Sequence, residues 1–168
     1  MGVDLQPPEV TIRDADAGDL DLLACLLGHA VAWQPDLPAL EAATVLRAPG
    51  ISHYLQGWPR DGDHGLVAAG DGQPIGAAWW RLFAAQEPGY GYVAADVPEV
   101  AIAMVAPWRG RGVGTLLMAA LITSARSRGL GALSLSVHHD NPAARLYERL
   151  GFVAVGRLND ATTMLLEL

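Results

Sequence analysis

The chain has 168 residues, a formal net charge of −7 and a hydrophobic fraction of 51%, which predicts a single globular domain over residues 1–168. All eleven basic residues are arginine. The absence of lysine excludes a P-loop nucleotide hydrolase and Schiff-base catalysis, since both need a lysine. The negative net charge disfavours nucleic acid as a partner.

Location is predicted from the cysteine count and the apolar runs. The single cysteine, Cys25, cannot form an intramolecular disulfide, which suits a reducing cytoplasm. Residues 1–10 contain acids and prolines and do not resemble a signal peptide. The longest apolar run, residues 116–122, is too short to cross a bilayer. We therefore expect a cytoplasmic protein with no membrane partner.

Charge is divided unevenly along the chain. Residues 1–99 hold four arginines and 14 acids, a net −10, whereas residues 100–168 hold seven arginines and four acids, a net +3. A basic second half predicts an anionic ligand there. The alternative is that several of these arginines, Arg126, Arg128, Arg145 and Arg149, only solvate helix faces.

The first half predicts short elements separated by breakers. Residues 10–13 predict a strand, and apolar positions at helical spacing in residues 20–27 predict a helix after an acidic start. Prolines and glycines in residues 31–60 allow only one or two short helices. The apolar runs 66–69 and 75–83 flank a glycine-containing turn and predict a hairpin.

The second half predicts alternating strands and helices. Residues 100–105 are apolar throughout, as in a strand buried on both faces. Asn141 and Pro142 predict a helix start, with Asn as the N-cap. The order of elements predicts a mixed sheet of the α/β class with helices on both faces. The remaining predicted elements are a helix over 113–128, a strand over 133–137, a helix ending at Leu150, and strands over 152–157 and 162–167.

A glycine-rich turn carries the strongest chemical signal. Residues 105–115 read VAPWRGRGVGT, between a predicted buried strand and a predicted helix. Uncovered amides at a helix start, together with the helix dipole, bind phosphate or pyrophosphate. Arg109 and Arg111 add permanent positive charge. The third glycine is out of register for a dinucleotide fingerprint, and the alternative reading is a plain sharp turn.

Two motifs together resemble a known family. Arg109-x-x-Gly112-x-Gly114, after the end of a strand, looks like the acyl-CoA-binding motif of the GNAT superfamily of N-acetyltransferases. The stretch NPAARLYERLGF at residues 141–152 looks like that family's second signature. Similarity at the motif level covers residues 97–157. The resemblance implies a GNAT-like fold, with a mixed, mostly antiparallel twisted sheet, and no metal.

The resemblance also implies an acetyl-CoA site. In similar proteins two central strands splay apart and admit the pantetheine arm, and an amide of the first strand can polarise the thioester carbonyl. Asn141 would reach the pantetheine or act as a plain helix cap. The implied cofactor-binding residues are Met104, Val105, Arg109, Gly110, Arg111, Gly112, Val113, Gly114, Thr115, Asn141 and Tyr147.

Two catalytic residues are implied by position in the family. Tyr147 would protonate the departing thiolate, because a phenol with a pKa near 10 keeps its proton until it is needed; the alternative is a core aromatic. Glu99, at the start of the predicted central strand, would accept the proton of the amine, with a solvated charge as its alternative reading. His138 and His139 are competing bases. Because neighbouring strand residues point to opposite faces, His138, His139 and Asp140 are not expected to chelate a metal.

The predicted activity is direct acetyl transfer from acetyl-CoA to a primary amine of a small molecule. The alternatives are a protein N-terminal or lysine acetyltransferase and a non-catalytic acyl-CoA-binding module. A homodimer is left open. Aromatic residues in an acidic setting would favour a cationic amine, although Trp79 and Trp80 are expected in the core. The other aromatics of this expected acceptor region are Trp33, Trp58, Tyr90 and Tyr92.

Overall fold

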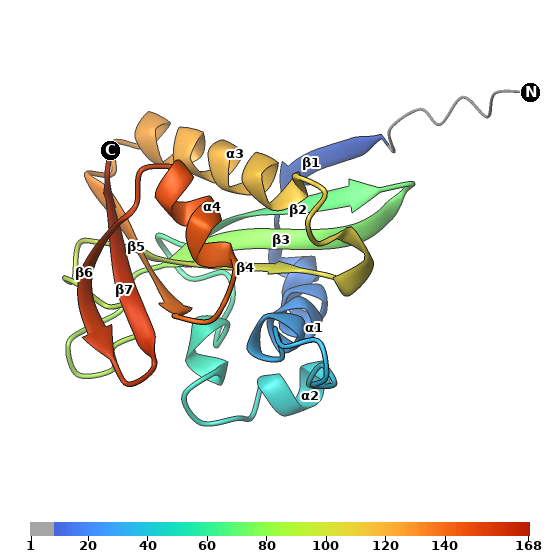
Figure 1. The fold of residues 1–168 in the computed structure, drawn as a ribbon, viewed down its shortest axis with the longest axis horizontal. Helices are drawn as coiled ribbons and strands as arrows, with labels where there is room; N and C mark the ends of the chain where they lie inside the picture. The colour runs from blue at the N-terminus through green and yellow to red at the C-terminus, as the bar shows by residue number, and fades with distance from the viewer. Residues whose placement is uncertain (1–8) are drawn as a thin grey trace, which may run out of the picture.

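A seven-stranded sheet runs through the protein in the order β1-β2-β3-β4-β5-β7-β6 (Figure 1). The computed structural model describes residues 9–168, so most of the stretch considered for a signal peptide, residues 1–8, lies outside the described residues. The strands are β1 (Val10–Asp14), β2 (His64–Gly70), β3 (Gln73–Arg81), β4 (Glu99–Met104), β5 (Ala132–His138), β6 (Val153–Leu158) and β7 (Ala161–Glu167).

The helices follow the predicted order. They are η1 (Ala17–Asp19), α1 (Leu20–Val31), α2 (Ala42–Val45), η2 (Ser52–Tyr54), η3 (Ala106–Trp108), α3 (Val113–Ser127) and α4 (Ala143–Arg149), where η marks a 3₁₀ helix. Residues 31–60 hold only short helices, as their prolines and glycines predict. Among the described residues, no helix is long and apolar enough to cross a membrane.

Strand pairing is antiparallel everywhere except between β4 and β5, which are parallel. The β2–β3 turn contains Asp71 and Gly72, both with positive φ, the backbone that a two-residue hairpin turn requires. The predicted α/β class and the mixed, mostly antiparallel sheet are therefore confirmed.

Each face of the sheet has its own core. Helices α3 and α4 cover one face, where Leu117 and Leu121 pack with Val100 and Leu135. Helices α1 and α2 lie on the opposite face (Figure 1), where Leu23 and its neighbours pack against the sheet. Because side chains alternate along β4, Glu99, Ala101 and Ala103 share the face covered by α1. This alternation decides which side of the sheet each candidate residue can reach.

Candidate active site

The strands β4 and β5 separate from one another soon after they begin. Their register contains one pair, Glu99 with Ser134, and the amide of Ser134 donates to the Pro98 carbonyl at 3.0 Å. Beyond this point β4 pairs only with β3, and β5 pairs only with β7. Such a gap leaves the facing edges of two strands without ladder partners, so their backbone groups are available to a ligand.

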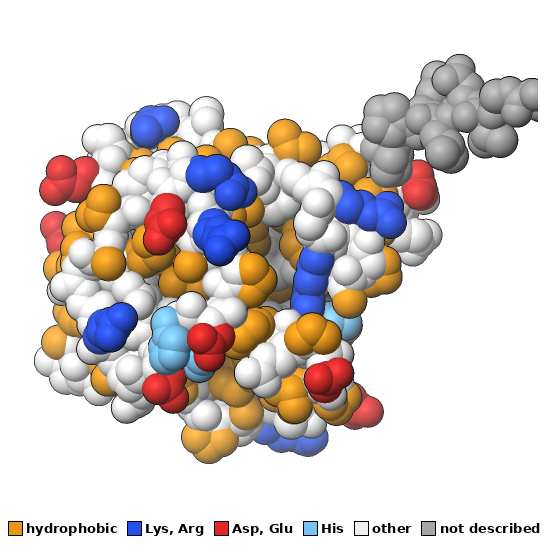
Figure 2. Space-filling model, viewed as in Figure 1, with side chains coloured by type: hydrophobic (Ala, Val, Ile, Leu, Met, Phe, Trp, Pro, Cys, Tyr) orange, Lys and Arg blue, Asp and Glu red, His pale blue; other side chains and the backbone are white. Residues whose placement is uncertain are grey.

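A cavity of about 540 Å³ lies at this gap. Figure 2 looks on to this face and shows a hollow with hydrophobic side chains inside it and arginine side chains on its rim. Its lining comes from α1, β4, the glycine-rich turn and α4. It includes eight of the residues predicted to bind the cofactor, namely Met104, Arg109, Gly110, Gly112, Gly114, Thr115, Asn141 and Tyr147.

The glycine-rich turn presents backbone amides at the start of α3. Gly110 and Gly112 have φ of 73° and 83°, and a Cβ on either would meet no atom within 4 Å. The amide of Leu116 donates to the Gly112 carbonyl at 3.1 Å, so the amides before it in the first turn have no acceptor within the helix. Open space beside free amides at the positive end of a 15-residue helix is suited to an anion.

The two arginines of the turn differ in their contacts. Arg109 donates to the carbonyls of His29, Trp33 and Met104 at 3.0, 3.3 and 3.2 Å, so its guanidinium ties the end of α1 to β4. Its amide donates to the Ala106 carbonyl, and the free amides therefore begin after it. Arg111 is exposed, with its guanidinium 5.2 Å from the centre of the Trp108 ring. Arg111 is thus the arginine of this turn whose charge is free to meet a phosphate.

At the end of β4, the backbone groups of Val105, which were predicted to bind the cofactor, are already hydrogen-bonded. The amide of Val105 donates to the Ile75 carbonyl at 3.0 Å, and its carbonyl accepts from Trp108. Because backbone groups alternate along a strand, the amide of Met104 faces the β5 side and the gap. Met104, rather than Val105, therefore offers an amide to a ligand, since both backbone groups of Val105 are already used.

Asn141 has a capping bond and also lines the cavity. Its Oδ1 accepts from the amide of Ala143 at 3.0 Å. This is the bond expected of an N-cap, although α4 begins one residue later than predicted.

Tyr147 is buried in α4, packs against Phe152 and lines the cavity. Burial raises the pKa of its hydroxyl, because the phenolate would lose hydration. Within residues 9–168 this hydroxyl forms no hydrogen bond. A protonated phenol beside the gap is suited to donate a proton to an anion there.

Glu99 is 3% exposed, so it is not a solvated charge. Its Oε1 accepts from the hydroxyl of Tyr54 at 2.5 Å and from the amide of Gly91 at 2.9 Å. Its Oε2 is buried beside Gly89 and has no hydrogen-bond partner among residues 9–168. Burial raises the pKa of Glu99, opposed by the two hydrogen bonds. Oε1 is thus held by two donors, whereas the lone pairs of Oε2 remain available to accept a proton. Glu99 is not among the residues that line the cavity at the gap.

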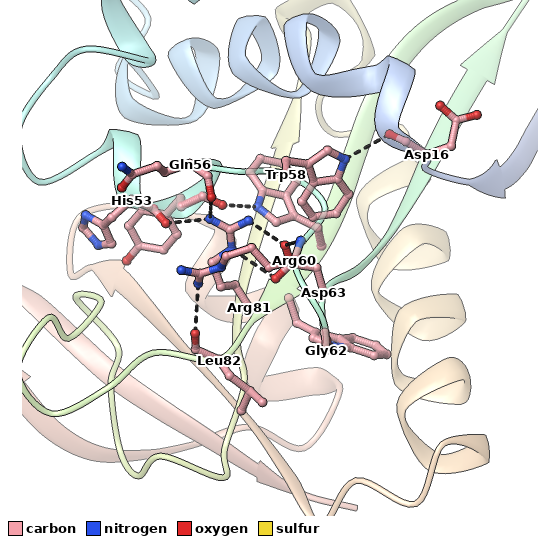
Figure 3. A network of polar contacts seen from close by, with 12 residues as sticks. Asp16, His53, Gln56, Trp58, Arg60, Gly62, Asp63, Arg81 and Leu82 are labelled. Atoms are coloured by element: carbon pink, nitrogen blue, oxygen red, sulfur yellow. Dashed lines mark hydrogen bonds and ion pairs between the residues drawn. The ribbon is translucent and has the colours of Figure 1, made fainter.

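A buried ion pair supports the segment that holds Glu99, and it was not among the residues predicted from the sequence (Figure 3). Arg81 is 0% exposed, pairs with Asp63 and donates to the carbonyls of His53 and Gln56 at 2.9 and 2.8 Å. These carbonyls flank Tyr54, so the pair fixes the backbone that presents the Tyr54 hydroxyl to Glu99. An arginine within the apolar run IGAAWWRLF was the available signal, because a buried charge needs a partner.

The histidines at the end of β5 are arranged differently from the prediction. The rings of His138 and His139 stack with centroids 4.7 Å apart, and their nitrogens lie near Asp140. The strand ends at His138, so the alternation of side chains no longer applies at His139. His138 also lies 5.4 Å from the Trp33 ring, which lines the cavity.

The six aromatic residues predicted in the core or the acceptor region divide into three groups. Trp79 and Trp80 are buried in the two cores, as predicted. Trp58, predicted in the acceptor region, is instead buried in the core beside α1, where its Nε1 donates to the Asp16 carbonyl at 3.0 Å. Trp33 lines the cavity at the gap. Tyr90 and Tyr92 line a second cavity, between the β3–β4 loop and β6.

Comparisons with known proteins agree with this geometry. Residues 30–152 match the model of the acetyltransferase (GNAT) family. An N-acetyltransferase of Streptomyces griseus is 30% identical over 151 residues, which cover 88% of this chain and 76% of that protein. A mycothiol acetyltransferase of Rhodococcus jostii is 39% identical over 92 residues, 52% of this chain but 28% of that protein. The match thus spans little more than a quarter of the mycothiol enzyme.

Solved structures share the fold. A ribosomal-protein-alanine N-acetyltransferase from Brucella melitensis has a TM-score of 0.69 and 24% identity, over 94% of this chain and 99% of that one. An acetyltransferase from Salmonella typhimurium, solved with acetyl-CoA, has a TM-score of 0.69 and 23% identity, over 95% of this chain and 94% of that one. At these identities the likeness shows the fold alone.

Proposed function

Because the chain belongs to the acetyltransferase (GNAT) family, we propose that it transfers the acetyl group of acetyl-CoA directly to a primary amine of a small molecule. The observation that carries the proposal is the cavity at the β4–β5 gap. It brings together the free amides of a helix start, the open edge of β4 and the phenol of Tyr147.

The residues present fit acetyl-CoA. The amides from Gly112 to Thr115 suit a pyrophosphate, and Arg111 adds a neighbouring positive charge. The edge of β4 near Met104 offers backbone groups to the amides of a pantetheine arm. The Salmonella structure named above was solved with acetyl-CoA, which supports the assignment.

The chemistry requires the nitrogen of an ammonium to lose two protons and the sulfur to gain one. The amine, after its first deprotonation, attacks the acetyl carbonyl carbon with its lone pair, a C–N bond forms, and the π electron pair of the carbonyl moves to oxygen. The carbonyl then re-forms as the C–S bond breaks, the electron pair of that bond stays on sulfur as a thiolate, and the nitrogen releases its second proton to water. Tyr147 would protonate that thiolate, and Glu99 would accept the proton of the amine through its free Oε2, by way of water. His138, beside Trp33, is the competing base.

The alternatives are acetylation of a protein amine and acyl-CoA binding without turnover. We propose a cytoplasmic location, which agrees with a single cysteine that cannot form an intramolecular disulfide. Sedimentation velocity would decide whether it forms a homodimer.

The test measures thiol release from acetyl-CoA across a panel of amines, for the natural chain and for Tyr147→Phe. We expect turnover with at least one small amine and a kcat lowered about 10²–10⁴-fold in the variant, with CoA affinity unchanged. Unchanged turnover would remove the acid role of Tyr147. CoA binding without turnover on any amine would favour the binding module, and turnover on peptides alone would favour a protein substrate.

A further inference from the structure

The turn after β5 brings two imidazoles and a carboxylate together. Nδ1 of His138 lies 4.0 Å from Oδ2 of Asp140, and Nε2 of His139 lies 3.9 Å from the same oxygen. One ligand atom from each of the three residues lies within 4.8 Å of the other two. Imidazole nitrogens with a carboxylate oxygen form a donor set that zinc and related divalent transition metals bind in proteins.

The end of the strand makes this arrangement possible. Within a strand, His138 and His139 would point to opposite faces, which predicts that they do not share an ion. However, β5 ends at His138, and the amide of Asn141 donates to the His138 carbonyl at 2.9 Å, so the chain turns here. The amide of His139 donates to the carbonyl of Asp160, in the β6–β7 turn, at 3.0 Å. The backbone that carries the three side chains is therefore held in place.

Two of the donor groups are already in the form that a cation needs. Nδ1 of His138 accepts from the amide of Asp140 at 3.2 Å, so this nitrogen carries a lone pair on the side of the carboxylate. Within residues 9–168 the carboxylate of Asp140 pairs with no arginine, whereas those of Asp19 and Asp63 each do. A metal ion at His138 would replace one long hydrogen bond and neutralise an exposed carboxylate.

The ligand atoms need only small movements to reach an ion. Bonds of about 2.0–2.1 Å to a tetrahedral zinc ion hold ligand atoms about 3.3 Å apart, so these atoms must approach one another by at most about 1.5 Å. The side chains of His138, His139 and Asp140 are 32%, 49% and 71% exposed, so rotations can supply this movement without repacking the core. Their exposure also leaves a fourth position open to water.

The cluster adjoins the cavity at the gap. The ring of His138 lies 5.4 Å from that of Trp33, which follows α1 and lines the cavity. Asn141, the residue after Asp140, also lines the cavity and provides the capping bond of α4. Figure 2 shows histidine side chains beside acidic ones on the face that carries the hollow. An ion bound here would therefore lie at the rim of the cavity.

We propose that His138, His139 and Asp140 bind a divalent transition metal ion, Zn²⁺, at the rim of the cavity. The ion takes Nδ1 of His138, Nε2 of His139 and Oδ2 of Asp140 as protein ligands, with water in the fourth position. This proposal is independent of the proposed acetyl transfer, because it concerns the binding of the ion alone.

The experiment is calorimetric titration of the tag-free protein with ZnCl₂, for the natural chain, His139→Gln, Asp140→Asn and Cys25→Ser. Cys25 provides the control, because its exposed thiol lies four residues before His29 on α1 and offers zinc a rival pair of ligands. We expect one ion per chain, with an affinity lowered at least about tenfold in His139→Gln and in Asp140→Asn. Cys25→Ser should bind as the natural chain does.

The place of the ion is checked through Trp33, with Cu²⁺ as the probe, since Cu²⁺ also binds imidazole and quenches the fluorescence of a nearby indole. The intensity lost on adding one equivalent of Cu²⁺ should be larger for the natural chain than for Trp33→Phe. Equal losses would overturn the proposal. So would the absence of zinc binding, equal zinc affinity in all four proteins, or binding that is lost only in Cys25→Ser.

Discussion

On one side of the β4–β5 gap the turn before α3 presents backbone amides, whereas at the apex of the gap Glu99 is held by groups from distant segments. The first side depends on the φ angles of two glycines and on a helix start within residues 110–115. The second depends on Tyr54, Gly91 and the Arg81–Asp63 pair. The anion site is thus a local backbone feature, and the candidate base is a product of tertiary packing.

The largest effect on catalysis is expected at Glu99, on the side of the gap that depends on tertiary packing. Glu99→Gln keeps the shape of the side chain and both acceptor bonds at its Oε1 position, but it removes the base. We expect kcat to fall about 10²–10⁴-fold, with CoA affinity within a factor of two. Initial rates and a separate CoA titration check this. A decrease below threefold would transfer the role to His138 or to water.

The pH dependence follows from the raised pKa of Glu99. Since the base must be ionised, kcat should fall as the pH is lowered through this raised pKa, above the ordinary value of 4.5. The folded state binds the extra proton in the window between the two values, so the contribution of Glu99 to stability is lost as pH rises through that window. Urea midpoints of the natural chain and Glu99→Gln should therefore converge towards low pH.

Of these variants, the one that breaks the buried ion pair should lower the free energy of unfolding the most. Arg81→Met leaves Asp63 charged and buried, for which we expect a loss of about 3–5 kcal/mol in the free energy of unfolding. The matched control is Arg13→Met, whose arginine side chain is 53% exposed in its pair with Asp19 and should cost about 1 kcal/mol or less. Equal urea midpoints for the two variants would contradict the account.

The backbone side is tested with two neighbouring glycines. Gly112→Ala places a Cβ at φ 83° with no steric contact, so it should cost about 1–2 kcal/mol through backbone strain alone and weaken CoA binding. Gly114→Ala lies inside α3, where a Cβ meets only ordinary contacts, and should leave stability unchanged or raise it by about 1 kcal/mol. Thermal unfolding distinguishes them, and a reversed order would contradict the assigned turn.

The smallest effect is expected for Arg111, an exposed charge at the rim. Arg111→Gln should weaken CoA binding about two- to fivefold, and the loss should shrink at high salt, since exposed charges are screened. Titrations at two salt concentrations measure it, with Arg126→Gln as the matched control. An effect as large as that of Gly112→Ala would mean that side-chain charge, rather than the turn backbone, dominates binding.

The glycine-rich turn can be predicted from the sequence better than the surroundings of Glu99, because the turn is a local feature and the surroundings of Glu99 depend on tertiary packing. Gly110, Gly112 and the capping residues of α4 act within a few residues of themselves, so their spacing predicts the turn and the helix start, and the family resemblance adds the residues that line the cavity. The Tyr54–Glu99 bond joins residues 45 positions apart, which no local pattern encodes. The contacts of Arg109 with the Trp33 and His29 carbonyls likewise depend on packing. The local motif therefore predicts Arg109 beside a phosphate site, whereas its guanidinium binds backbone carbonyls.

The most direct measurement is a titration of ¹⁵N-labelled protein with CoA, followed through the backbone amides. The account predicts that the largest shifts fall on Gly112 to Thr115 and on Met104, with small shifts at Gly91 and Tyr54. Large shifts confined to β6 and the β3–β4 loop, with none at the start of α3, would contradict the assignment of the gap as the acetyl-CoA site.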